Sequence, residues 1–296
     1  MRAGTGSKQS VCAVIVTYHP TVKMIEIVPA VLAQVQALVV IDNGSSAEEL
    51  APLRMSSRTL GFQLIENGDN FGIAEGLNRG VQWAKGQGYP WIILFDQDSL
   101  LPSDFMEQMF AAWQSHPHRD KVGSIHPRYL DPETGEEGIV PRENDGSPIL
   151  PMTSGTLMPA WIFERVGWFA SDFFIDLVDW DFSFRIRAAG FVVADAKGAT
   201  LLHAPGKPAK ATFLGHTFLQ SNHSALRRYY ISRNRIVFFR KYLRSFPGWV
   251  AAGAYAQLKE TIVCLLVEEN RGRKLRNILL ATWDALSGRM GKREGL

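Results

Sequence analysis

Two aspartates one residue apart, Asp96 and Asp98, directly follow the apolar run Trp91–Phe95. That run has the composition of a strand that is buried on both faces. Mg²⁺ and Mn²⁺ take oxygen ligands and usually keep open positions that substrate phosphates can fill. The pair therefore indicates a divalent-cation site at a strand end, although two acids in a solvated loop would give the same pattern.

Other polar residues also follow predicted strands. Val11–Tyr18 and Leu38–Ile41 are continuous apolar runs rich in β-branched residues, and Thr59–Ile65 is a third predicted strand. Segments with helical spacing separate these runs, which predicts βαβ units and a parallel sheet. Ligands of such sheets bind beyond the carboxyl ends of the strands. The polar residues that we expect to converge there are Tyr18, Asp42, Asn70 and Asp96.

Asn70–Asn78 places small residues at the start of a predicted helix. Small residues permit close approach of the backbone, and a helix N-terminus favours a phosphate. The segment matches neither the G-x-G-x-x-G pattern of dinucleotide-binding enzymes nor the P-loop pattern, so both classes are poorly supported. The turn Asp42–Ser45 follows a strand, and its Asp42 either shapes the turn or accepts hydrogen bonds from a base or ribose.

Three features in the second half of the chain could also carry chemistry. Asp179 and Asp181 either cap the helix that follows them or include a general base. His203 ends a predicted strand and is either an ordinary core or surface histidine or a ligand of a metal or a phosphate. A group of arginines forms either a solvated helix face or a clamp for a diphosphate, to which guanidinium groups are suited. These arginines are Arg227, Arg228, Arg233 and Arg235.

The composition is that of a globular protein with an uneven distribution of charge. The 296 residues suit one large domain or two modest ones, and 46% hydrophobic against 21% charged residues exclude a disordered or collagen-like chain. Arg227–Leu296 carries 15 Lys and Arg against five Asp and Glu, a net charge of +10. Since the whole chain has a net charge of +3, the residues before Arg227 have a net charge of −7. An acidic body and a basic C-terminal region indicate two different partners.

The chain has few features of an exported or membrane-spanning protein. Cys12 and Cys264 each lie in an apolar run, which predicts reduced core cysteines rather than a disulfide framework. Residues 1–10 lack the apolar stretch of a signal peptide. The longest apolar segment, Trp249–Val267, is interrupted by polar and charged residues, so no bilayer-spanning helix is expected. The sequence therefore predicts a cytoplasmic protein.

The C-terminal third is predicted to be helical, and residues 204–216 before it form a loop long enough to be a lid. We predict a first domain over residues 1–220 and a basic amphipathic helical region over residues 221–296. The predicted helices are Ser221–Tyr242, Trp249–Glu269 and Arg273–Leu286, and two short strands, Phe191–Ala194 and Ala199–Leu202, precede the loop.

Taken in order, these segments resemble the family 2 glycosyltransferases, which use nucleotide sugars on a GT-A fold. The matching segments are Val14–Tyr18, Asp42–Ser45, Asn70–Asn78, Asp96–Asp98, Asp179 with Asp181, His203 and Tyr229–Asn234. Within that family, three segments look most like bacterial rhamnosyltransferases: Asp96–Ser99, Thr153–Leu157 and Phe173–Asp179. The resemblance implies a Rossmann-like α/β domain, with a mostly parallel sheet flanked by helices, and a C-terminal helical extension.

The resemblance also implies a role for each matching residue. Asp179 would be the catalytic base, although Val178 stands where many members carry Glu, so Asp181 stays an alternative. Asp98 and His203 would hold Mg²⁺ or Mn²⁺. The residues expected on the acceptor or diphosphate side are Asp181, Arg233 and Asn234. The residues expected to line the nucleotide-sugar pocket are Thr17, Tyr18, Asp42, Asn70, Gly72, Asp96 and Gln97.

By resemblance, the chain would transfer L-rhamnose with inversion from dTDP-β-L-rhamnose to a hydroxyl of a glycan acceptor in bacterial cell-surface polysaccharide synthesis. A different nucleotide-sugar donor on the same fold is the nearest alternative. A glycoside hydrolase that uses Asp179 and Asp181 as its two carboxylates is another. A non-catalytic, membrane-associated assembly partner is the third.

The C-terminal helices bear on the acceptor and on localisation. Their apolar face is flanked by Arg271, Arg273, Lys274 and Arg276, which suits an anionic membrane surface. The same face could pack on the catalytic domain or form a homo-oligomer. The membrane alternative implies a lipid-linked acceptor and a peripheral position on the inner face of the cell membrane. No nucleic-acid partner is expected.

Overall fold

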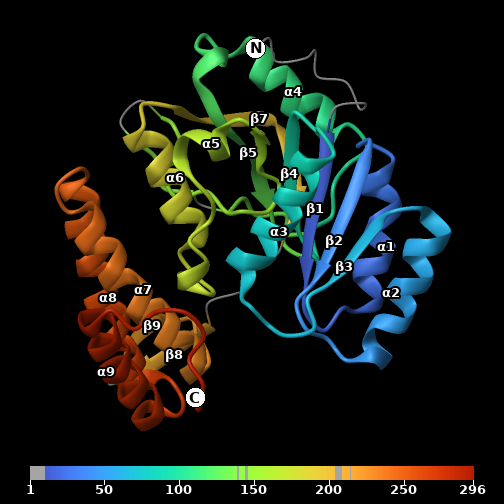
Figure 1. Ribbon diagram of the computed structural model, residues 1–296. Helices are drawn as coiled ribbons and strands as arrows, with labels where there is room; N and C mark the ends of the chain where they lie inside the picture. The colour runs from blue at the N-terminus through green and yellow to red at the C-terminus, as the bar shows by residue number, and fades with distance from the viewer. Residues whose placement is uncertain (1–10, 139, 144–145, 204–208, 214) are drawn as a thin grey trace. The chain divides into compact units, whose positions relative to one another are not determined.

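The computed structural model describes residues 11–138, 140–143, 146–203, 209–213 and 215–296. These residues form two compact units (Figure 1). The first consists of the described parts of Met1–Ser171 and Val178–Ala204, and the second consists of Asp172–Leu177 and the described part of Pro205–Leu296. A short segment from the middle of the chain thus belongs to the C-terminal unit, which no change in composition indicates.

The first unit is built on a seven-stranded sheet with the order β3-β2-β1-β4-β6-β5-β7. The four strands from β3 to β4 are parallel, β6 runs antiparallel to both of its neighbours, and β5 is parallel to β7. This confirms the predicted α/β fold with a mostly parallel sheet. The strands are β1 (Val11–Thr17), β2 (Ala37–Asp42), β3 (Gln63–Glu66), β4 (Trp91–Asp96), β5 (Val122–Leu130), β6 (Leu157–Pro159) and β7 (Val192–Leu202).

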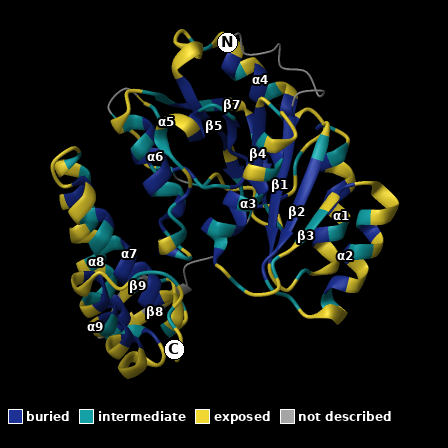
Figure 2. Cartoon of the chain, viewed as in Figure 1, coloured by how far each residue is buried: buried dark blue, intermediate teal, exposed yellow. Residues whose placement is uncertain are grey.

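Helices cover both faces of this sheet, so the central strands are buried as expected from their continuous apolar runs (Figure 2). On one face, Ile15 and alternate residues of the central strands form a core with α1, α2 and α4. On the other face, α3 packs so closely on β1 that a Cβ atom at Gly76 would come within 2.7 Å of a Val16 methyl group. The helices are α1 (Val22–Leu32), α2 (Ala47–Leu60), α3 (Ile73–Gly86), α4 (Phe105–Ser115), α5 (Ile162–Val166) and α6 (Val178–Ala188), with 3₁₀ turns at Arg119–Lys121 and Ser171–Phe173.

The structure corrects several predicted boundaries in the first unit. The strand predicted from Thr59 starts only at Gln63, because α2 continues to Leu60 and ends at Gly61 in the left-handed conformation. The two short strands predicted after residue 190 form the single strand β7, whose pairing with β5 shifts register after Pro127. The helix α4 and the strands β5 and β6 were not predicted.

The second unit contains a hairpin and three helices. The strands β8 (Ala209–Phe213) and β9 (His216–Gln220) pair antiparallel, so part of the predicted loop 204–216 is a hairpin, while residues 204–208 and 214 lie outside the described residues. The three predicted helices are confirmed as α7 (Ala225–Tyr242), α8 (Pro247–Val267) and α9 (Arg271–Ser287).

A buried ion cluster ties the three helices of the second unit together. Glu268, which is 1% exposed, follows α8 and accepts hydrogen bonds from Arg228 of α7 (2.7 Å) and Lys274 of α9 (2.9 Å). Burial alone would raise the pKa of Glu268, but the two cationic donors outweigh it and the pKa lies below its ordinary value.

Candidate active site

Two carboxylates and an imidazole gather at the carboxyl end of β4, and we call them the acidic cluster. Asp96 ends β4, Asp98 lies in the following turn and His203 directly follows β7. One ligand atom of each lies within 4.8 Å of the others. His203 Nδ1 is 3.6 Å from Asp98 Oδ1, and His203 Nε2 is 4.0 Å from Asp96 Oδ2.

A backbone contact explains how His203 reaches this strand end from a distant part of the sheet. Leu100 and Leu202 form an isolated antiparallel bridge with hydrogen bonds of 3.0 and 2.9 Å. The bridge fixes the turn that carries Asp98 against the end of β7. Since it depends on residues about one hundred positions apart, no local pattern indicates it.

The chemistry of the acidic cluster fits a divalent cation. His203 Nδ1 is buried and has no hydrogen-bond partner among the described residues, as expected for an atom that donates its lone pair to a metal. Asp98 is 59% exposed, which leaves room for a ligand beside it. The pKa of Asp96 lies above its ordinary value, because burial disfavours the charged form and Asp98 adds a like charge, while His203 acts in the opposite direction.

The strand end of β1 is joined to the acidic cluster through Gln97. Thr17, which is 1% exposed, lies 2.5 Å from Gln97 Oε1 through its hydroxyl, and the backbone N–H of Tyr18 donates to the same oxygen at 3.2 Å. The Tyr18 side chain is 44% exposed. The structure therefore brings together three of the residues predicted for the nucleotide-sugar pocket, and leaves the Tyr18 ring accessible to a base.

The strand end of β2 is organised by the buried carboxylate of Asp42. Its Oδ2 accepts hydrogen bonds from the N–H groups of Gly44 and Ser45, and its Oδ1 accepts from the Ser45 hydroxyl. Asn70 is also engaged locally, since its Oδ1 accepts from the Gly72 N–H at 2.9 Å. Asp42 and Asn70 thus shape the loops at this edge of the sheet, and both loops precede helices of the first unit.

The segment Thr153–Leu157, which was given no role in the sequence analysis, contacts the end of β4 through Ser154. The Ser154 hydroxyl accepts from the Asp96 backbone N–H at 3.1 Å and lies 2.6 Å from the Ser99 hydroxyl. The buried hydroxyl of Tyr129 donates to the carbonyl oxygens of Met152 and Ser154. Sequence reasoning missed Ser154 and Tyr129 because β5 and β6 were not predicted.

Asp179 lies near the same tyrosine. The pKa of Tyr129 is raised well above its ordinary value by burial, and next by the negative charges of Asp179 and Asp96. Both carboxylates therefore act on one buried hydroxyl. Asp179 is half-buried in the first turn of α6, and its Oδ1 accepts from the Trp180 N–H at 2.9 Å. It also lines a cavity whose other walls include Leu94, Met152, Thr153, Met158, Phe169 and Phe182.

Asp181 differs sharply from Asp179 in its surroundings. Its side chain is fully buried and pairs with Arg185 at 2.9 Å, one turn further along α6. Arg185 also donates to the carbonyl oxygens of Val166 and Trp168. Asp181 therefore anchors α6 to the loop after α5, which differs from the acceptor-side role that the resemblance implies.

Arg233 and Asn234 belong to the second unit and are both fully buried. The Arg233 guanidinium donates to the carbonyl oxygens of Asp172, Phe173 and Gly291 and to the Asn234 side chain. Asn234 donates to the same Phe173 carbonyl oxygen and to those of Ile175 and Asp176. These contacts occupy the guanidinium with backbone carbonyls, so the structure does not present Arg233 to a diphosphate as the resemblance implies.

The family assignment follows from comparison with known proteins. A sequence model described as Glycosyl transferase family 2 matches residues 12–161, just over half of the chain. The chain belongs to glycosyl transferase family 2. The matched residues contain the strand ends of β1, β2 and β4 and the segment Thr153–Leu157, while α6 to α9 lie beyond them.

Similar proteins extend the comparison over nearly the whole glycosyltransferase. The dTDP-rhamnosyl transferase RfbF of Shigella flexneri is 25% identical, over 95% of this chain and 97% of RfbF. Among solved structures, S. aureus TarS (residues 1–349) superposes with a TM-score of 0.64 at 10% identity, over 95% of this chain and 82% of that one. The mannosyltransferase PcManGT from Pyrobaculum calidifontis, in complex with GDP-Man and Mn²⁺, gives 0.57 at 15% identity, over 94% and 75%. These structural likenesses establish the GT-A fold.

Proposed function

We propose that this glycosyltransferase transfers L-rhamnose from dTDP-β-L-rhamnose, with inversion, to a hydroxyl of a lipid-linked glycan acceptor in bacterial cell-surface polysaccharide synthesis. The observation that carries the proposal is the acidic cluster at the end of β4. Its Asp96 backbone is bonded to Ser154, in the segment that adjoins the cavity lined by Asp179. The similarity to RfbF, named as a dTDP-rhamnosyl transferase, along nearly the full length of both chains supports the choice of donor.

Asp98, His203 and Asp96 are the residues that would hold Mg²⁺ or Mn²⁺. When bound, such an ion offsets the negative charge that develops on the departing nucleoside diphosphate. Two carboxylate oxygens and one imidazole nitrogen leave positions open for phosphate oxygens, which is typical of ions that bind a nucleotide together with the protein. The accessible Tyr18 ring and the Thr17–Gln97 contact would border the nucleoside.

Asp179 is our choice for the general base. Its carboxylate would accept the proton of the acceptor hydroxyl as that oxygen attacks the anomeric carbon and the bond from that carbon to the diphosphate oxygen breaks. A single displacement of this kind inverts the anomeric centre. The half-buried position of Asp179 suits this role better than that of Asp181, because the Asp181 carboxylate is buried against Arg185. The same pairing weakens the hydrolase alternative, which needs both carboxylates at the bond that is cleaved.

A donor panel tests the proposal. The protein is incubated with dTDP-rhamnose, UDP-glucose, UDP-N-acetylglucosamine or GDP-mannose and Mn²⁺, and release of nucleoside diphosphate is recorded with Asp98→Ala as the matched inactive control. We expect the fastest release from dTDP-rhamnose and none with Asp98→Ala. Faster turnover of another donor would refute the rhamnosyl assignment. Absence of nucleotide-sugar binding in calorimetry would instead favour the non-catalytic alternative.

A further inference from the structure

The last helix of the second unit carries an exposed apolar stripe, which we call the α9 stripe. Leu275, Leu279, Trp283 and Leu286 are spaced by four, four and three residues, so they lie along one side of α9. Trp283 is 68% exposed, Leu286 64% and Leu279 62%. Three large apolar side chains in water on one helix are unusual for a soluble surface and indicate an interaction site.

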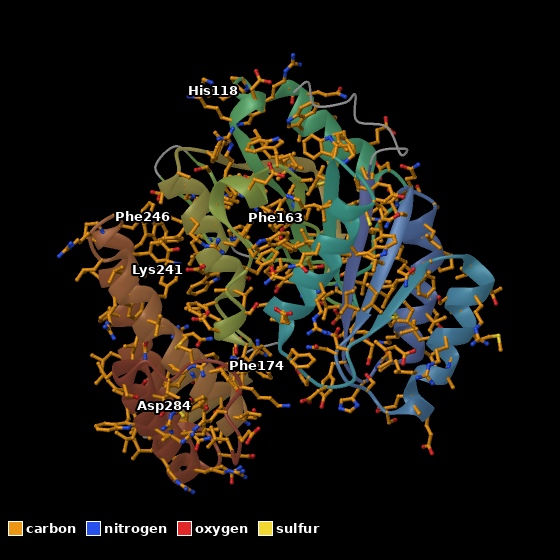
Figure 3. All side chains as sticks on the ribbon, viewed as in Figure 1. His118, Phe163, Phe174, Lys241, Phe246 and Asp284 are labelled. Atoms are coloured by element: carbon orange, nitrogen blue, oxygen red, sulfur yellow. The ribbon has the colours of Figure 1, made fainter. Side chains whose placement is uncertain are left out.

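The charges beside the α9 stripe have a single sign. Arg273 and Arg276 are exposed and make no ion pair with a described carboxylate. Arg271 is exposed as well, and it donates to a backbone carbonyl. The only acid of α9, Asp284, is fully buried and accepts a hydrogen bond from Tyr229, and Figure 3 shows it among the side chains of the C-terminal helices. The solvent-facing side of α9 is therefore apolar and cationic.

A second exposed apolar stripe lies on α8, where Tyr255, Leu258 and Ile262 are 71%, 60% and 48% exposed. By length and composition alone, α8 could cross a bilayer. Its centre carries Glu260, however, which pairs with Arg235 of α7 at 2.8 Å. An ion pair with a neighbouring helix and a charged centre favour a helix that lies along an interface over one that crosses it.

We propose that the α9 stripe, with its flanking arginines, inserts into the headgroup region of an anionic lipid bilayer. Leucine and tryptophan side chains supply the apolar contact, and a tryptophan at the stripe suits the boundary between water and hydrocarbon. Arginines that lack carboxylate partners are attracted by anionic lipids within a Debye length. The inference deepens the membrane-linked acceptor in the proposed function, but binding to lipid requires no transfer activity.

Vesicle flotation with the full chain tests this surface. One set of vesicles is pure phosphatidylcholine, and the other contains one-third phosphatidylglycerol. We expect flotation with the anionic vesicles only, loss of flotation in concentrated salt and, on binding, a blue shift of tryptophan fluorescence that the Trp283→Ser variant lacks. Trp283→Ser with Leu279→Ser, and separately Arg273→Glu with Arg276→Glu, should each weaken binding about tenfold or more.

The matched control is Leu60→Ser with Arg58→Glu, an exposed leucine and arginine near the end of α2 in the first unit. This control should float as the unaltered chain does. Equal flotation of the α9 variants and the unaltered chain would overturn the proposal. A concentration-dependent dimer that Trp283→Ser abolishes, without vesicle binding, would also overturn it and assign the stripe to a second copy of the chain. Donor binding by calorimetry separates these outcomes from failure of the enzymatic proposal.

Discussion

Replacing Asp179 and Asp181 separately with Asn distinguishes a catalytic carboxylate from a structural one. The two residues are two positions apart in the first turn of α6, and both substitutions keep the size of the side chain. Asp179 is half-buried beside the cavity, and Asp181 is fully buried against Arg185. We therefore expect Asp179→Asn to abolish transfer in a stable protein, and Asp181→Asn to destabilise a protein that is otherwise competent.

The magnitudes follow from these surroundings. Loss of a general base lowers the rate by about 10²–10⁴-fold, which corresponds to about 3–5 kcal/mol in activation free energy. The stability cost at Asp179 is small, about 0.3–1 kcal/mol for a negative charge near a helix N-terminus, and the Asn oxygen can still accept from the Trp180 N–H. Removing the charge of Asp181 leaves the largely buried Arg185 unpaired, which costs about 3–5 kcal/mol.

Two measurements on each variant decide the matter. Single-turnover transfer from labelled dTDP-rhamnose gives the chemical step, and thermal unfolding followed by circular dichroism gives Tm. For a unit of this size, each kcal/mol lost from the free energy of unfolding lowers Tm by about 2–4 °C, so Asp181→Asn should lower Tm by roughly 6–20 °C. Donor affinity, from calorimetry, should stay near the unaltered value in Asp179→Asn. The reasoning is refuted if Asp181→Asn melts normally and loses transfer, because Asp181 would then be the base.

Three further predictions concern other parts of the chain. Removing metal with EDTA should stop transfer, and adding Mn²⁺ or Mg²⁺ should restore it. Asp98→Asn should prevent this restoration without lowering Tm, because Asp98 is exposed. Restored activity in that variant would contradict the metal site. Thr17→Val removes the hydroxyl next to Gln97 and should weaken donor affinity about 2- to 10-fold, as measured by calorimetry, whereas an unchanged Kd would remove Thr17 from the pocket. Glu268→Gln should destabilise the second unit by about 3–5 kcal/mol at neutral pH, while the exposed neighbour Glu269→Gln serves as control. The pKa of Glu268 is lowered in the folded state, so its contribution to stability is present above the ordinary glutamate pKa of about 4.3 and is lost as the pH falls through the lowered value. Urea titrations at descending pH should therefore show less acid sensitivity in Glu268→Gln than in the unaltered chain.

The strands β1, β2 and β4 were predictable because each is a continuous apolar run, and only a strand buried on both faces tolerates such a run. Where the signal was weaker, the prediction failed. Leu60 was assigned to a strand, but it is the last residue of α2. A capping box formed by Ser46 and Glu49 fixes the N-terminus of that helix. The strands β5 and β6 lie between irregular segments, and β6 has only three residues, so no periodicity marks it.

The candidate site was predictable to the extent that it follows from strand ends. Asp96, Gln97 and Thr17 meet because parallel strands place their carboxyl ends at one edge of the sheet. Ser154 could not be assigned in this way, since it reaches Asp96 through the antiparallel strand pairing that begins at residue 157. The position of His203 depends on the bridge between Leu100 and Leu202, which is a long-range backbone contact.

The basic character of the C-terminal region illustrates why charge counts indicate partners only in outline. Its net charge of +10 includes both buried and exposed cations, which the sequence does not distinguish. Arg228, Arg233 and Lys274 are nearly or fully buried and donate to carboxylates or carbonyl oxygens within the second unit, so they stabilise its fold. Arg273 and Arg276 face solvent beside the α9 stripe, and only such exposed cations can act on an anionic partner at a distance of a Debye length. Reversing the exposed pair should therefore change the salt dependence of membrane binding, whereas neutralising a buried cation should change the free energy of unfolding.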